Sequence, residues 1–238
     1  MSTNLSERVV AISGATGVLG QEAARQFAAQ GARLALLSSS GEKLEQMAQK
    51  LGLKEERALL LASDLRKAQE AHNAIQAILA RFDHADILLH LVGGWTGGKL
   101  ITESDSVETS QMLDQHLWTT YFMVQALTPH LVANGWGRII AISSPLASRP
   151  AAKMSPYIIA KAAQEALLLS LAQEIRGSGV TANVLQVKTI DAKGEKARNP
   201  SPENATWSTV PEIMAAVMYL CSEEAGMVNG ARIPLYGS

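Results

Sequence analysis

The sequence predicts one α/β domain over residues 1–238, with a doubly wound parallel sheet of about seven strands and helices on both faces. Two observations predict this class. Short, almost wholly apolar runs alternate along the chain with longer segments in which apolar residues recur at helical period. Aromatic residues make up only 5% of the chain, a composition that suits a layered α/β domain better than a β-sandwich.

We predict strands at the short apolar runs, because parallel strands that are covered on both faces need no polar side. These runs are residues 9–13, 34–37, 58–62, 87–91, 138–143, 181–186 and 232–235. Helices are predicted at the amphipathic segments, which are residues 21–30, 42–51, 68–81, 107–134, 157–177 and 211–222. Residues 189–209 are the longest irregular stretch, and we expect them to form a substrate loop or lid.

The charge and composition exclude several classes of protein. The net charge is −1 and no basic tract occurs, so we expect neither a nucleic-acid partner nor a membrane surface. No apolar run reaches the roughly 18 residues of a membrane span. The polar start of the chain lacks the apolar stretch of a signal peptide. The single cysteine, Cys221, excludes an internal disulfide, and its apolar neighbours predict burial. We therefore expect a cytoplasmic protein without a metal site.

A glycine-rich turn connects the first predicted strand to the first predicted helix, and it reads SGATGVLG over residues 13–20. Glycine allows a tight turn here and lets the backbone approach a diphosphate at the N-terminus of the helix. The turn therefore predicts a dinucleotide site, with an ordinary glycine-rich turn as the alternative. The cofactor-binding residues that it contributes are Gly14, Thr16, Gly17, Val18 and Leu19.

The second predicted strand ends in Ser38, Ser39 and Ser40. In dinucleotide folds an acidic residue at this place binds the ribose 2′-hydroxyl, whereas a basic residue receives a 2′-phosphate. Hydroxyl groups tolerate a phosphate better than a carboxylate would, so Ser38 and Ser39 favour NADP and leave NAD possible. The alternative is that these serines only cap the helix that begins near Glu42.

Tyr157 and Lys161 stand four residues apart on a predicted helix, which places both side chains on one face. An ammonium beside a phenol favours the phenolate and lowers the pKa of the tyrosine from about 10. A tyrosine tuned in this way can give a proton to a carbonyl oxygen or take one from an alcohol. The spacing alone can arise by chance. Ser144, at the end of the strand predicted at 138–143, lies thirteen residues before Tyr157.

This combination of glycine turn, Ser144, Tyr157 and Lys161 resembles the short-chain dehydrogenase/reductase family, which has a Rossmann fold. The resemblance implies an NAD(P)-dependent enzyme that interconverts a ketone or aldehyde with an alcohol. It implies that Tyr157 transfers the proton, that Ser144 orients the substrate oxygen, and that Lys161 lowers the Tyr157 pKa and holds the nicotinamide ribose. It further assigns four residues after the third and fourth strands to the cofactor, namely Asp64, Leu65, Val92 and Gly93.

The chain departs from the family pattern at several places. His116 stands where the family has a catalytic asparagine, and we predict a catalytic role for it because imidazole also donates and accepts hydrogen bonds. The alternative is a packed, satisfied histidine. His90 precedes Leu91 where the family has two asparagines, and we expect it to be structural. Lys188 follows Val187 where the family has Pro-Gly, and we expect it at the surface.

Two functions therefore remain open, an active oxidoreductase and a dinucleotide-binding regulatory module with weak or lost catalysis. The intact Ser144, Tyr157 and Lys161 favour the enzyme. Residues near the predicted site suggest a small, mainly apolar substrate. They are Trp95, Thr96, Pro145, Leu146, Met154 and Trp207, of which the two tryptophans are alternatively packing residues.

The helix predicted at 157–177 is apolar around much of its circumference. Its apolar residues include Ala162, Ala163, Ala166, Leu167, Leu168 and Leu171. One sheet contact does not need so many, and in the family the two long central helices pair with a second subunit. We therefore expect a homodimer or homotetramer.

Overall fold

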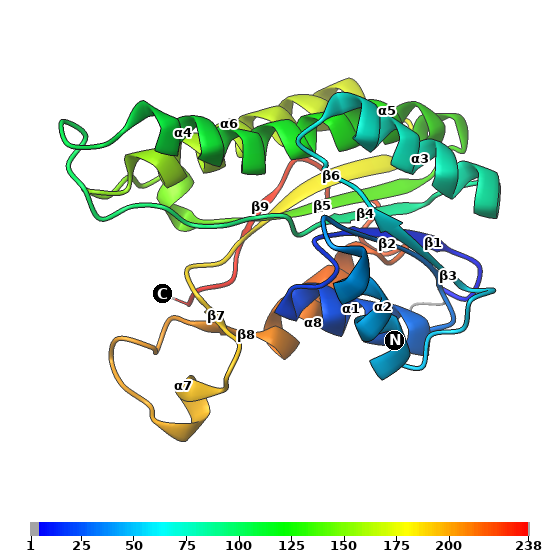
Figure 1. Ribbon diagram of the computed structural model, residues 1–238, viewed down its shortest axis with the longest axis horizontal. Helices are drawn as coiled ribbons and strands as arrows, with labels where there is room; N and C mark the ends of the chain where they lie inside the picture. Colours follow the sequence, from blue (N-terminus) through cyan, green and yellow to red (C-terminus); the bar gives the residue numbers. More distant parts are fainter. Residues whose placement is uncertain (1–4, 238) are drawn as a thin grey trace.

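A computed structural model describes residues 5–237 and has a parallel sheet of seven strands between two layers of helices (Figure 1). The strand order is β3-β2-β1-β4-β5-β6-β9, so the predicted doubly wound fold class is confirmed. The strands are β1 (Val9–Ser13), β2 (Arg33–Ser38), β3 (Ala58–Ala62), β4 (Ile87–His90), β5 (Gly137–Ser143), β6 (Val180–Gln186) and β9 (Arg232–Pro234). Within residues 5–237 no helix is long and apolar enough to cross a bilayer.

The helices cover both faces of the sheet (Figure 1). One layer holds α1 (Val18–Ala29), α2 (Gly41–Lys50) and α8 (Val210–Leu220). The other holds α3 (Ala68–Phe82), α4 (Ser106–Leu113), α5 (Thr119–Ala133) and α6 (Ser155–Glu174). Because side chains alternate along a strand, Val9 and Ala11 enter the core under α3, α5 and α6, while Val10 and Ile12 enter the core under α1, α2 and α8. The strands are therefore apolar on both sides.

The direction of strand order reverses between β1 and β4, which makes the crevice beyond their carboxyl ends the expected ligand site of such a sheet. Gly14 follows β1 with a φ of +75°. A Cβ atom at Gly14 would lie 2.8 Å from the carbonyl carbon of Leu91, which follows β4. Only glycine therefore lets the two strand ends approach this closely.

Two predicted segments differ from the structure. The helix predicted at 107–134 is interrupted by a π-helical turn, Asp114–Trp118, which separates α4 from α5 and contains His116. Such wide turns insert one residue into a helix and are common at functional sites. The stretch predicted to be irregular, 189–209, contains β7 (Ile190–Asp191), α7 (Glu195–Arg198) and β8 (Ser208–Thr209). The Asp191 carboxylate accepts hydrogen bonds from the backbone N–H groups of Glu195 and Lys196, which fixes the start of α7.

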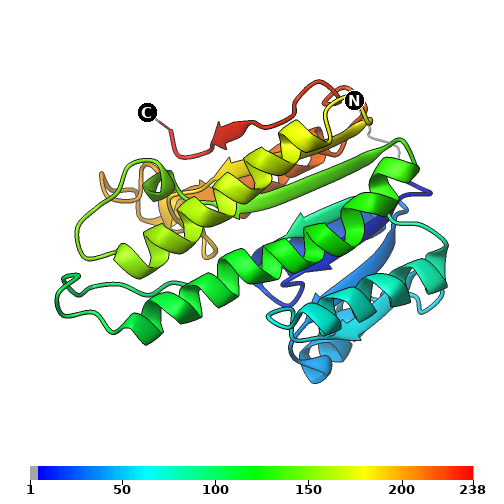
Figure 2. The same cartoon turned by 90° about the horizontal axis from the view of Figure 1, so that it is seen from above.

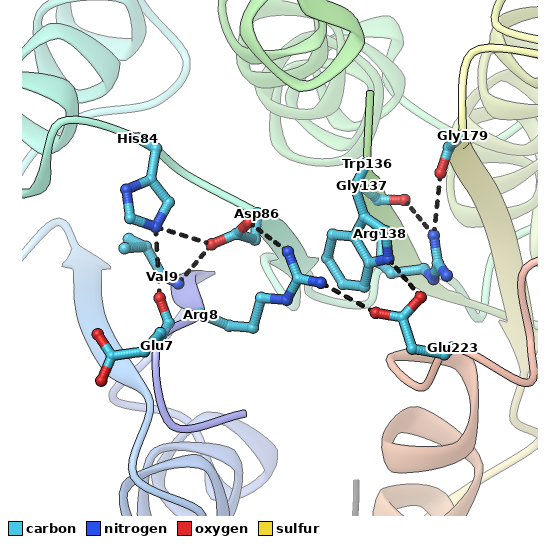
Figure 3. Close-up of polar contacts among 10 residues, drawn as sticks. All are labelled: Glu7, Arg8, Val9, His84, Asp86, Trp136, Gly137, Arg138, Gly179 and Glu223. Atoms are coloured by element: carbon cyan, nitrogen blue, oxygen red, sulfur yellow. Dashed lines mark hydrogen bonds and ion pairs between the residues drawn. The ribbon is translucent and has the colours of Figure 1, made fainter. Parts of the chain in front are cut away.

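A polar cluster closes the opposite, amino-terminal edge of the sheet (Figure 3). The buried carboxylate of Asp86 accepts hydrogen bonds from Arg8 Nη1 at 3.0 Å and from the Val9 N–H at 2.7 Å. The Arg8 guanidinium lies 3.6 Å from the centre of the Trp136 ring, and Glu223 accepts hydrogen bonds from both side chains. These contacts join the segments that lead into β1, β4 and β5 at one edge of the sheet.

Candidate active site

Two cavities open at the carboxyl ends of the central strands. The first, of about 590 Å³, extends towards the ends of β2 and β3, and the second, of about 410 Å³, extends towards α6. Their walls share Gly14, Gly17, Leu91, Val92 and Gly93. The two cavities are therefore parts of one groove that crosses the switch point of the sheet.

The walls of this groove contain every residue that the sequence assigns to the cofactor. The larger cavity is lined by Gly14, Thr16, Gly17, Ser38, Ser39, Asp64, Leu65, Val92 and Gly93. The smaller cavity adds Val18, Leu19, Tyr157, Lys161 and His116. Residues from seven elements or the loops after them thus meet along one surface.

The groove suits a dinucleotide for a reason that does not depend on motif matching. Gly17 precedes α1 and gives it no side-chain cap, and the first residues of α1 line the smaller cavity. Uncapped N–H groups at a helix N-terminus bind phosphate groups well. A Cβ atom at Gly20 would lie 2.5 Å from the carbonyl oxygens of Gly14 and Ala15, so only glycine fits beneath the turn.

The three serines at the end of β2 have two different roles, one in capping α2 and the other in lining the larger cavity. Ser40 caps α2, since its Oγ accepts a hydrogen bond from the Lys43 N–H at 3.4 Å. Ser38 and Ser39 line the larger cavity, and the Ser38 hydroxyl hydrogen-bonds with that of Thr16 at 3.0 Å. The capping alternative therefore applies to Ser40.

Sequence reasoning missed Arg66, which lines the same cavity as Ser38 and Ser39. Its exposed guanidinium donates to both carboxylate oxygens of Asp64, at 2.7 and 2.9 Å. These hydrogen bonds lower the pKa of the Asp64 carboxyl and raise the pKa of Arg66. The available signal was an arginine two residues after Asp64, which the family resemblance assigns to the cofactor, because it follows a strand end at the ligand edge.

Ser144 and Tyr157 meet at the end of the groove nearest α6. Ser144 follows β5 and is 2% exposed, while Tyr157 lies in the first turn of α6, where Pro156 opens the helix. Burial raises the pKa of the Tyr157 phenol, and a side-chain hydrogen bond with Ser144 opposes that rise. The phenol is therefore neutral at ordinary pH and is able to donate a proton.

The contacts and the pKa of Lys161 differ from those that the sequence predicts. Its buried ammonium donates to the carbonyl oxygen of Ile142 at 2.7 Å and to Gln164 Oε1 at 3.0 Å. Burial lowers the pKa of Lys161 to about 7, with the carboxylate of Glu165 acting in the opposite sense. The predicted lowering of the Tyr157 pKa by Lys161 is thus wrong for this arrangement, because burial of the phenol dominates its pKa.

His116 lies beside Tyr157 in the smaller cavity. Its Nε2 is 3.0 Å from the carbonyl oxygen of Gly94 and 3.4 Å from the backbone nitrogen of Gly94, so either tautomer of the neutral ring has a partner there. Within residues 5–237 its buried Nδ1 has no hydrogen-bond partner. Burial lowers the pKa of His116 to about 3, with a smaller contribution from Lys161. The ring is therefore a neutral group with one unpaired nitrogen.

The other two residues that depart from the family pattern, His90 and Lys188, form hydrogen bonds with neighbouring side chains. His90 is buried, and its ring hydrogen-bonds with Ser13 at 2.7 Å and with Thr119 at 3.1 Å. Burial lowers the pKa of His90 to about 3. Lys188 is exposed and donates to the Thr206 hydroxyl. Cys221 is buried, as predicted, and burial raises the pKa of its thiol to about 12.

The residues predicted to line a mainly apolar substrate site do not line either cavity. These are Trp95, Thr96, Pro145, Leu146, Met154 and Trp207, and Trp95 is 58% exposed. Ile142, Ile190 and Ala192 lie in the wall of the smaller cavity instead. In residues 5–237 no three His, Cys, Asp or Glu side chains gather as a metal site would require.

Known proteins resemble this chain along its length. A family model described as short chain dehydrogenase matches residues 8–203. Nodulation protein G of Rhizobium sp. (strain N33) is 29% identical over 241 residues, which cover 98% of this chain and 97% of that protein. The 1,6-dihydroxycyclohexa-2,4-diene-1-carboxylate dehydrogenase of Pseudomonas putida is 28% identical over 258 residues, which cover 100% of this chain and 94% of that protein.

A solved structure shares the fold. The 3-ketoacyl-(acyl-carrier-protein) reductase from Brucella melitensis, complexed with NADH, superposes with a TM-score of 0.86 at 22% identity and covers 97% of both chains. The family model spans most of the chain, and the relatives match nearly all of it. The chain is therefore a member of the short-chain dehydrogenase/reductase family and an NAD(P)-dependent oxidoreductase.

Proposed function

We propose that this enzyme interconverts a carbonyl and an alcohol on a small, mainly apolar substrate, with Tyr157 as the acid/base. The observation that carries the proposal is the position of Tyr157 in the wall of the smaller cavity, together with Lys161 and His116 and next to Ser144. Apolar side chains of Ile142 and Ile190 in the wall of the smaller cavity support an apolar substrate.

During reduction, the Tyr157 hydroxyl donates its proton to the substrate oxygen, and its raised pKa keeps this proton available. The Ser144 hydroxyl donates a hydrogen bond to the same oxygen as negative charge develops there. A bound nicotinamide cofactor supplies the hydride. Lys161 holds the hydroxyls of the nicotinamide ribose through its ammonium, and His116 keeps the Tyr157 ring in place.

NADP is the proposed cofactor, with NAD as the alternative. The larger cavity offers two serine hydroxyls at the end of β2 and, after β3, the Arg66 guanidinium, all of which suit a 2′-phosphate. The carboxylate of Asp64 lies in the same wall and partly offsets the charge of Arg66. A direct comparison of NADPH and NADH affinity decides between them.

A second copy of the chain is the proposed partner, in a homodimer or homotetramer, and the proposed location is the cytoplasm. Helices α5 and α6 lie side by side (Figure 2). Trp118 and Tyr121 are 41% and 36% exposed, and together with Phe122 they form an aromatic cluster. On α6, Ala166 is exposed, whereas Leu168 and Leu171 fill the chain's own core. Light scattering at micromolar concentration tests the assembly, and a monomeric mass refutes it.

The alternative function is a dinucleotide-binding module with weak catalysis. The departures from the family pattern at His90, His116 and Lys188 favour this alternative. Oxidation of NADPH and NADH across a panel of carbonyl compounds separates the two functions. We expect Tyr157→Phe to lower kcat/KM by roughly 10²-fold or more without changing cofactor affinity. Tyr219→Phe, at an exposed position of α8, is the matched control. Equal background rates in wild type and Tyr157→Phe favour the module.

A further inference from the structure

Gln164 is a buried amide that no part of the proposed mechanism uses. It lies on α6 one turn after Lys161 and is 1% exposed. Its Nε2 donates to the Thr120 hydroxyl at 2.8 Å and, at 3.4 Å, to the carbonyl oxygen of His116. The Thr120 hydroxyl donates in turn to the same carbonyl oxygen at 2.6 Å. The amide therefore connects α6 to the π-helical turn that contains His116.

The orientation of this amide follows from the chemistry of its partners. An ammonium has three donors and no acceptor, so Lys161 must face the oxygen Oε1. The Thr120 hydroxyl gives its only proton to the His116 carbonyl, so it must accept from Nε2. Both ends of the amide are thus satisfied, as burial requires.

The Lys161 ammonium is held at two points. The carbonyl oxygen of Ile142, in β5, and Oε1 of Gln164 each accept one of its three N–H groups. In the described part of the chain these are its hydrogen-bond acceptors, and Lys161 lines the smaller cavity together with Tyr157. Two fixed N–H groups determine the direction of the third.

We propose that Gln164 is a positioning residue, whose amide holds the Lys161 ammonium against β5 and directs its remaining N–H into the cavity beside Tyr157. The same amide links the ammonium to the π-helical turn, so that the catalytic lysine and His116 keep a fixed relative position. The catalytic consequence rests on the proposed function. The placement of the ammonium does not depend on the proposed function, because it can be measured in the absence of turnover.

Among the described residues, four titratable groups lie near Lys161. Tyr157 and Glu165 lie on α6, while His90 comes from β4 and His116 from the π-helical turn. The pKa values of both histidines are about 3, so these rings are neutral near pH 7. The Glu165 carboxylate is already bound by Arg232 at 2.6 Å and by Gln186 at 3.0 Å. The neutral amide of Gln164 is therefore the acceptor whose replacement acts most directly on the ammonium.

Two substitutions act on Lys161 in opposite directions. Gln164→Glu places a carboxylate where Oε1 now lies, which favours the ammonium and raises the pKa of Lys161. Gln164→Leu removes an acceptor from a buried cation, which lowers that pKa further. The fall in Gln164→Leu is the discriminating result, because only loss of an acceptor that stabilises the ammonium lowers the pKa of Lys161.

The first measurement is an NMR titration of protein labelled with ¹³C at lysine Cε, with the Lys161 signal assigned from Lys161→Met. We expect the Gln164→Glu midpoint to rise by about one pH unit or more and the Gln164→Leu midpoint to fall. Gln173→Glu, exposed on the same helix, leaves the midpoint unchanged. Equal midpoints in wild type, Gln164→Glu and Gln164→Leu overturn the proposal. If Gln164→Leu does not fold, the nearly isosteric Gln164→Glu still decides.

The second measurement is the pH profile of kcat/KM for carbonyl reduction with NADPH. Activity that requires the ammonium is lost as pH rises through the pKa of Lys161. The high-pH limb therefore moves up in Gln164→Glu and down in Gln164→Leu, and an unmoved limb contradicts the proposal. Absence of turnover in the wild type refutes the proposed function alone, since the NMR titration still tests the role of Gln164.

Discussion

The ring of His116 lies edge-on to the ring of Tyr157, with 5.7 Å between the ring centroids and 80° between the ring planes. This contact joins the π-helical turn to the first turn of α6 at the wall of the smaller cavity. On its other side His116 approaches Gly93, where an added Cβ atom would lie 3.1 Å from the ring. His116 therefore fills the space between the loop after β4 and the proposed proton donor.

Removal of this ring should affect the rate more than the fold. We expect His116→Ala to lower kcat/KM for carbonyl reduction by roughly 10- to 100-fold, because Tyr157 loses the side chain that positions it. His116→Asn keeps a donor for the Gly94 carbonyl and should retain more activity. Steady-state kinetics check this, with the exposed His72→Ala as the control. Unchanged kinetics in His116→Ala mean that the histidine only fills space.

The buried histidines should make the protein sensitive to acid. His90 and His116 have pKa values of about 3 in the folded chain, because burial disfavours the charged ring. A histidine in the unfolded chain has a pKa near 6.5, so between about pH 3 and 6.5 the unfolded state binds more protons. The free energy of unfolding therefore decreases as pH falls through this range.

A substitution at His90 separates this effect from general acid sensitivity. His90→Asn keeps hydrogen-bonding groups near Ser13 and Thr119. We expect it to reduce the dependence of the free energy of unfolding on pH by about 1.4 kcal/mol per pH unit well below pH 6.5. Urea unfolding between about pH 4 and 7 measures the slope. The exposed His72→Asn is the control, and an equal slope in all three proteins contradicts burial of a neutral His90.

Arg66 should determine the affinity for a 2′-phosphate. We expect Arg66→Ala to raise the Kd for NADPH by roughly tenfold and to change the Kd for NADH much less, because only NADPH carries the second anionic group. Fluorescence titration with both cofactors measures this. Arg25→Ala, on the exposed face of α1, is the control, since Arg25 pairs with Glu22 away from both cavities. An equal rise in the Kd values for NADPH and NADH shows that Arg66 does not discriminate between the two cofactors.

The polar cluster in Figure 3 should stabilise the fold without affecting the site. We expect Asp86→Ala to lower the free energy of unfolding by about 3 kcal/mol, since it leaves the Val9 N–H without its acceptor and removes one of the two carboxylates that bind Arg8. Glu7→Ala removes an exposed carboxylate nearby and should cost at most about 1 kcal/mol. Urea unfolding compares the two variants. An Asp86→Ala protein as stable as Glu7→Ala contradicts this account of the cluster.

The sequence by itself determined the sheet, the glycine turn and the residues that meet along the groove. Apolar runs specify strands covered on both faces, and residues after the carboxyl ends of such strands must meet at one edge. Ser144, Tyr157 and Gly14 could therefore be assigned from their positions relative to strands and helices. The family resemblance added the roles of these residues.

Only the tertiary structure decided how the side chains at this edge pair with one another. Gln164 meets the carbonyl of His116 across 48 residues of sequence, and their contact depends on the wide π-helical turn and on the packing of α6. The direction of Lys161 and the pKa of Tyr157 follow from burial and from the acceptors within reach, which spacing along one helix does not specify. Periodicity locates an element in the fold, whereas hydrogen bonds between elements depend on distances that only the assembled layers fix.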